Sequence, residues 1–96
     1  MAKKAKSTRS RGKRPSPAPA WTDALGSAVQ KRRKALGLTQ QALSQLAGCG
    51  VVFVYALENG KPGVRLNKLL DVLSVLGLQL ALEPGKSTLR VHEALQ

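Results

Sequence analysis

The chain has 96 residues, a length typical of one small domain, and 43% of them are apolar, which is enough for one hydrophobic core. A formal net charge of +11 is large for this size and predicts a polyanionic partner. One cysteine and one histidine exclude a disulfide framework and a zinc cluster within a single chain, so we expect no metal or other cofactor.

Residues 1–20 form a basic, Pro-rich arm. Seven of the 16 Lys and Arg residues fall in the first 14 positions, and no acidic residue precedes Asp23. Residues 21–96 carry nine basic and five acidic side chains, a net charge of only +4. The pattern predicts a solvated, disordered arm that would strengthen DNA binding without adding sequence preference.

The first helix is expected from about Asp23 to Leu36, with Thr22 as its N-cap and Gly37 as the residue that ends it. Its inward face follows helical spacing and comprises Leu25, Ala28, Val29, Arg32 and Leu36.

Two short helices follow. Thr39 is expected to cap the second helix, which Gly48 ends, and the third helix follows residues 49–50 and runs to about Asn59. The inward positions are Ala42, Leu43, Leu46 and Ala47 in the second helix, and Val54 and Leu57 in the third. Two short helices joined by a tight, glycine-containing turn predict a helix-turn-helix, whose second helix enters the DNA major groove.

A fourth helix is expected over 65–76, with an apolar face formed by Leu66, Leu69, Leu70, Leu73 and Leu76. Residues 78–84 then alternate like a strand, which needs a pairing partner. We favour an antiparallel ribbon with a second copy of the chain over pairing with residues 87–91. The fold class is therefore all-α with a short C-terminal strand, divided into the arm at 1–20, a DNA-binding domain at 21–77, a dimerisation strand at 78–84 and a tail at 85–96.

The chain resembles the phage-repressor-like (Cro/C1, Xre-type) helix-turn-helix proteins in the runs 37–48 and 57–61. The runs 61–70 and 76–84 are more specifically similar to the HipB-like antitoxins. That resemblance implies a lambda-repressor-like domain of four or five helices, a strand shared across a homodimer, repression of its own operon and binding to a HipA-like serine/threonine kinase toxin.

The resemblance also implies the DNA contacts. Thr39 would cap the second helix, and Gln40 would contact phosphate and base. The groove and backbone contacts beyond them would be Gly50, Val51, Val52, Tyr55, Asn59 and Lys61. Two valines depart from the polar pattern of the family, because valine cannot make bidentate hydrogen bonds to guanine or adenine, although it can contact thymine methyl groups.

Other readings remain open at the level of the sequence. A stand-alone Xre-type regulator and a non-specific basic nucleic-acid-binding protein are the alternatives to the antitoxin. Glu58 is expected to be a structural partner for a basic residue such as Arg32 rather than a functional acid. We expect no enzyme, because no catalytic set of residues is apparent, and no transmembrane span, because the apolar stretch 69–82 is interrupted by polar residues and glycine. A cytoplasmic, nucleoid-associated protein fits these features.

Overall fold

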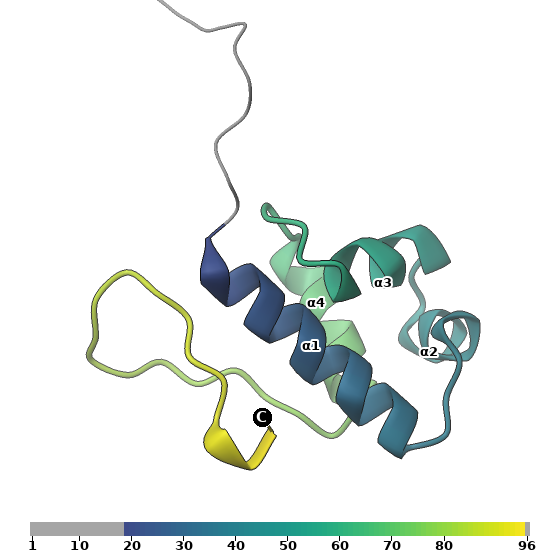
Figure 1. Cartoon of the computed structure of the whole chain (residues 1–96). Helices are drawn as coiled ribbons and strands as arrows, with labels where there is room; N and C mark the ends of the chain where they lie inside the picture. The colour runs from purple at the N-terminus through teal and green to yellow at the C-terminus, as the bar shows by residue number, and fades with distance from the viewer. Residues whose placement is uncertain (1–18, 96) are drawn as a thin grey trace, which may run out of the picture.

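The structure, a computed structural model, describes residues 19–95, so the basic arm expected at 1–20 lies almost wholly outside the described residues. Within them the chain forms helices α1 (Ala20–Ala35), α2 (Gln40–Ala47), α3 (Val51–Glu58) and α4 (Leu66–Val75), and a short 3-10 helix, η1 (Glu93–Leu95). Figure 1 shows α1 crossing in front of α4, with α2 and α3 to one side. The described part of the chain is thus an all-helical domain, as the sequence predicts.

One apolar cluster joins the four α-helices. Its buried members, drawn from every helix, are Leu25, Val29, Leu43, Val54, Leu57, Leu69, Val72, Leu73 and Leu76. Burying a side chain of this kind stabilises the fold by about 1.5–3 kcal/mol. These buried members are all aliphatic, and Phe53, which is partly buried, packs against them.

Two helix boundaries confirm the capping expected from the sequence. The hydroxyl of Thr39 accepts a hydrogen bond of 3.0 Å from the backbone N–H of Ala42, which satisfies one free donor at the start of α2. Gly37 adopts φ +74° after α1, and the N–H of Leu38 donates to the carbonyl of Arg33 at 3.1 Å. A glycine is required here because the left-handed conformation is unfavourable for residues with a Cβ.

The start of α1 differs from the expectation. The helix begins at Ala20, three residues before Asp23, and Pro19 occupies the N-cap position. Thr22 therefore lies inside the first turn, where its hydroxyl donates to the carbonyl of Pro19 at 2.7 Å. A proline is well suited to this position because it has no N–H to leave unsatisfied.

Four leucines expected on inward faces are exposed instead, namely Leu36, Leu46, Leu66 and Leu70. The inner face of α4 is formed by Leu69, Val72, Leu73 and Leu76, which follow i, i+3, i+4, i+7 spacing. For Leu66 and Leu70 the sequence prediction was wrong because α4 carries leucines on two faces and only one of them packs against the core and α2.

The strand expected at 78–84 is absent from residues 19–95, and so is its alternative pairing with 87–91. Figure 1 shows this segment as an open loop that returns to η1. Arg90 closes the loop by donating from Nε and Nη2 to the two carboxylate oxygens of Glu83, at 3.2 and 3.0 Å, which lowers the pKa of Glu83. Leu89 packs against the core and η1 contacts α1. A strand forms only with a hydrogen-bonded neighbouring strand, and none is formed within residues 19–95.

None of the helices in the described part of the chain combines the length and the apolar character that a membrane span requires.

Candidate nucleic-acid interface

Helices α2 and α3 form a bent pair joined by three residues. Gly48 ends α2 in the left-handed conformation with φ +72°, and the N–H of Cys49 donates to the carbonyl of Ser44 at 2.9 Å. Val54 and Leu57 anchor α3 in the core and leave its opposite face at the surface. This is the geometry of a helix-turn-helix, in which the second helix is presented outward.

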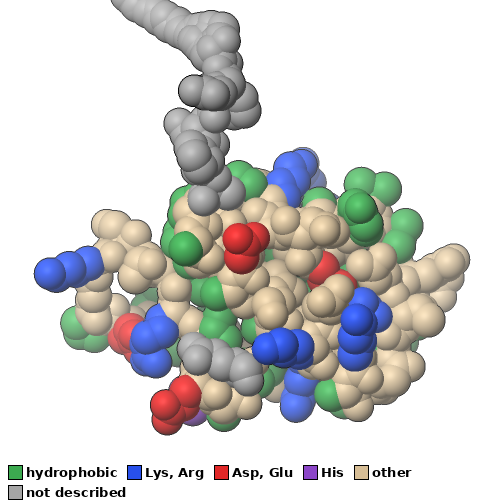
Figure 2. All heavy atoms as spheres, viewed as in Figure 1, with side chains coloured by type: hydrophobic (Ala, Val, Ile, Leu, Met, Phe, Trp, Pro, Cys, Tyr) green, Lys and Arg blue, Asp and Glu red, His purple; other side chains and the backbone are tan. Residues whose placement is uncertain are grey.

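The outward face of α3 is apolar. Val52 is 77% exposed and Tyr55 60% exposed, and Val51 beside them is also exposed. Gly50 precedes the helix as an exposed N-cap that offers no side-chain hydrogen bond. Figure 2 shows apolar side chains at the surface over the region where Figure 1 places α3. Four of the residues expected to contact DNA therefore share one exposed helix and its cap.

A close contact between backbones sets the position of α3 against α1. Gly26 in α1 lies so near the end of α3 that a Cβ added to it would be 2.6 Å from the carbonyl oxygens of both Leu57 and Glu58. Real Cβ atoms are essentially never found within 3.0 Å of such atoms. The two helices can approach this closely only because position 26 has no side chain.

A buried ion pair ties the same elements together. Arg33 donates from Nε to Oε2 of Glu58 at 2.7 Å and from Nη2 to Oε1 at 3.0 Å, and from Nη1 to the carbonyl of Leu38 at 2.8 Å. The side chains of Arg33 and Glu58 are only 9% and 1% exposed. The hydrogen bond to Glu58 raises the pKa of Arg33. Glu58 is thus a structural partner of an arginine, as expected, but that arginine is Arg33.

Arg32, the partner suggested by the sequence, has another role. Its Nε donates to the carbonyl of Leu76 at 2.9 Å, which satisfies one of the free carbonyls at the end of α4. Adjacent arginines on a helix differ by about 100° in direction, so only one of them faces the end of α3.

Gln40 joins the ion pair from the start of α2. Its Nε2 donates to Oε1 of Glu58 at 3.1 Å, and the residue is half-buried. The side chain expected to contact DNA is therefore held against the last residue of α3. Two more of the expected contacts also use their side chains within the fold: Thr39 caps α2, and Nδ2 of Asn59 donates to the carbonyl of Tyr55 at 2.7 Å.

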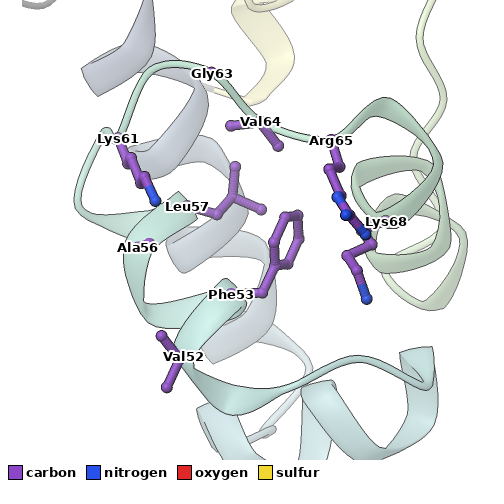
Figure 3. A pocket seen from close by; sticks show the side chains of 9 residues that line it. All are labelled: Val52, Phe53, Ala56, Leu57, Lys61, Gly63, Val64, Arg65 and Lys68. Carbon is purple, nitrogen blue, oxygen red and sulfur yellow. The ribbon is translucent and has the colours of Figure 1, made fainter.

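A cleft of about 320 Å³ lies between α3 and the start of α4. Figure 3 shows Phe53 and Leu57 reaching toward it from α3, Val64 above them, and Arg65 and Lys68 on the side of α4. Lys61, the one cation expected here, is joined by Arg65 and Lys68 at the rim, and no acidic residue lines the cleft. The sequence analysis did not include these two cations, although they follow the loop at 61–63 by only two and five residues, which was a usable signal.

The described residues contain no group of three or more His, Cys, Asp or Glu side chains that could hold a metal ion. What the geometry offers is an exposed apolar helix, a fixed polar network behind it and a cluster of cations beside it. Such a surface can contact base edges through apolar groups and a phosphate backbone through positive charge.

The chain is similar in sequence to known regulators. A helix-turn-helix family, HTH_3, matches residues 29–82. The uncharacterized HTH-type transcriptional regulator y4mF of Sinorhizobium fredii (strain NBRC 101917 / NGR234) is 40% identical over 63 residues, which cover 65% of this chain and 83% of that protein.

Solved structures share the fold. The restriction-modification controller protein C.AhdI from Aeromonas hydrophila matches with a TM-score of 0.59 and 28% identity, over 64% of this chain and 92% of its own. The clp gene regulator ClgR from C. glutamicum matches with a TM-score of 0.59 and 27% identity, over 69% and 85%. A chain in the structure of a HipA-HipB-O2-O3 complex matches with a TM-score of 0.62 over 74% of this chain and all of its own, but at 22% identity it shows the fold alone.

Proposed function

The chain belongs to the helix-turn-helix family HTH_3 and is a DNA-binding transcription regulator, and from that premise we propose that it is a sequence-specific repressor. The observation that carries the proposal is the exposed apolar face of α3, which a buried core and an ion pair hold rigidly outward. In this family of motifs the second helix lies in the major groove and the first crosses the DNA backbone.

The composition of that face determines how it reads DNA. Val51 and Val52 offer methyl groups that fit the C5-methyl group of thymine and cannot form bidentate hydrogen bonds with purines. Tyr55 adds a hydroxyl at the same face. Because few direct hydrogen bonds are available, a substantial part of the specificity would come from thymine contacts and from sequence-dependent DNA shape.

Backbone phosphates would be contacted beside the groove. Lys61, Arg65 and Lys68 surround a cleft with no acidic residue, and Lys61 and Arg65 are exposed. Phosphate contacts fix the position of a protein on DNA and weaken as salt rises. The arm at 1–18, outside the described residues, would add to the same salt-dependent attraction through its seven basic side chains.

We propose further that the repressor is a homodimer joined through residues 78–84. Leu80 is exposed and Leu82 fully so, although the sequence places them on the apolar side of an alternating segment. Pairing with the same segment of a second chain would bury both leucines and supply the missing hydrogen-bonded neighbour. Two copies of α3 would then read a palindromic operator in major grooves about 34 Å apart.

The test is gel-shift binding to the DNA upstream of the gene, with scrambled competitor, at two salt concentrations. We expect a shift that survives competitor at about 150 mM salt for the wild type, and a clear loss of affinity for Val52→Ala. Leu70→Ala, at an exposed apolar residue of α4, is the matched control and should bind as the wild type does. Binding that disappears with competitor or salt would favour a non-specific basic protein and refute the repressor.

A role as an antitoxin is the second candidate. The similarity of the runs 61–70 and 76–84 to HipB-like antitoxins and the match to a chain of the HipA-HipB-O2-O3 complex support it. Co-expression with the product of the adjacent gene tests it directly. Co-purification with a kinase, and loss of that kinase's toxicity, would support the antitoxin, whereas a neighbouring gene without a kinase would favour a stand-alone regulator.

A further inference from the structure

The side-chain amide of Gln40 is oriented by one hydrogen bond, which its NH2 group donates to Glu58. It is the first residue of α2, and its Nε2 lies 3.1 Å from Oε1 of Glu58. An ionised carboxylate only accepts hydrogen bonds, so the NH2 end of the amide must face Glu58. The second N–H and the amide oxygen of Gln40 remain available for another partner.

Glu58 is a fixed anchor for that amide. Its carboxylate is 1% exposed and accepts two hydrogen bonds from Arg33, which in turn is tied to the carbonyl of Leu38. A free glutamine side chain at a helix start would lose rotamer freedom when a ligand fixes it. Anchoring to Glu58 removes most of that freedom before the ligand arrives.

We propose that Glu58 is a positioning residue for DNA binding, which orients Gln40 so that its second N–H is donated to a hydrogen-bond acceptor on the DNA. The inference rests on the proposed function, because it assigns Gln40 to the DNA contact of α2. The acceptor is an oxygen or nitrogen atom of the DNA, and both a phosphate oxygen and the major-groove edge of a base offer that chemistry.

Charge alone makes the opposite prediction for position 58. Replacing Glu58 by glutamine removes a negative charge from the end of α3, which should strengthen attraction to the DNA polyanion. A role in positioning predicts weaker binding instead, because the new amide has one acceptor oxygen where the carboxylate has two, so Arg33 and Gln40 must compete for it. The sign of the change in affinity therefore separates the two effects.

The experiment compares Glu58→Gln, Gln40→Ala and the double variant in the full chain. Dissociation constants are measured on the upstream DNA and on a scrambled duplex, at a temperature where each variant is folded by circular dichroism. Each single variant should bind the upstream DNA about fivefold more weakly, the effect of one hydrogen bond, and the double variant no more weakly than Gln40→Ala alone. Leu70→Ala, at an exposed residue of α4 outside this network, is the control and should bind as the wild type does.

A second variant, Glu58→Asp, tests the same inference if Glu58→Gln does not fold. Glu58→Asp keeps the charge but withdraws the carboxylate by one methylene, which should break the single 3.1 Å bond to Gln40 before the two bonds to the longer side chain of Arg33. It should show the same fivefold loss. Wild-type affinity or tighter binding in either Glu58 variant, or additive losses in the double variant, would overturn the inference.

A panel of operators with single base changes identifies the acceptor. Uniform weakening of Gln40→Ala across the panel assigns a phosphate, and loss of preference at one position assigns a base. The proposed function fails separately, when the wild type does not distinguish the upstream DNA from the scrambled duplex. In that case non-additive losses of Glu58→Gln and Gln40→Ala on both duplexes still support the positioning role through a phosphate.

Discussion

Gly26→Ala tests whether the absence of a side chain at position 26 is what lets α1 and α3 pack so closely. In an ordinary helix interior, alanine is favoured over glycine by about 1 kcal/mol, so helix propensity predicts a more stable protein. The structure predicts the opposite sign. The new Cβ would be 2.6 Å from the carbonyl oxygens of Leu57 and Glu58, and an ordinary contact begins at 3.4 Å, so α1 and α3 must separate by about 0.8 Å.

The obstructing atoms are backbone atoms, which cannot turn aside as a flexible side chain can. Overpacking of this kind costs about 1–3 kcal/mol, and the rigid neighbours favour the upper end. After subtraction of the gain in propensity, we expect a net loss of about 2 kcal/mol, or a melting temperature roughly 8–16 °C lower.

Thermal unfolding followed by circular dichroism at fixed protein concentration measures this change. Ala24→Gly, at an exposed position of the same helix, is the control for propensity and should lower the melting temperature by about 4–8 °C. A melting temperature for Gly26→Ala that equals or exceeds that of the wild type would refute the close approach of α1 and α3.

Three further predictions concern single side chains. Thr39→Ala removes the cap of α2 and should cost about 1 kcal/mol, seen as a melting temperature lower by about 4–8 °C; no change would mean that the hydroxyl does not cap the helix. Burial raises the pKa of the Cys49 thiol, so its rate of alkylation should reach half-maximum at a higher pH than that of a free cysteine, and a lower midpoint would contradict this burial. Leu82→Asp should leave the melting profile of the helices intact but weaken the proposed dimer in sedimentation experiments, whereas a dimer of unchanged strength would place the interface elsewhere.

The sequence was most informative where one residue type has one physical use. Gly37 and Gly48 marked the ends of two helices because the left-handed conformation excludes most other residues, and Thr39 marked a helix start because its hydroxyl substitutes for a missing acceptor. These local rules located α2, the turn and α3, which together form the candidate interface.

The sequence was least informative where several residues of one type compete for one partner. Arg32 and Arg33 are both placed near the end of α1, and the direction of α3 decides which of them meets Glu58. In the same way, the local sequence pattern fits burial of either Leu66 or Leu69, and only the packing of α4 on its neighbours exposes the first and buries the second. Such choices depend on contacts between helices far apart in the chain, which single-sequence periodicity does not contain.

The burial of Glu58 is compatible with a position of α3 beside the negatively charged DNA backbone. Glu58 is the one acidic residue of α3, and the described structure buries it against Arg33, so the helix presents no exposed carboxylate to the DNA. Breaking such a buried pair by removing one partner is destabilising, so the charge at position 58 contributes to the stability of the fold as well as to the charge of the surface. In the proposed interface, attraction would be supplied by the cations around α4 and by the basic residues of the arm, while the α3 face would contribute shape and methyl groups. A face of this kind can discriminate between DNA sequences only if it is held in one position. The contacts that position α3, at Gly26 and Glu58, should therefore affect specificity although neither residue lies on the exposed face of the helix.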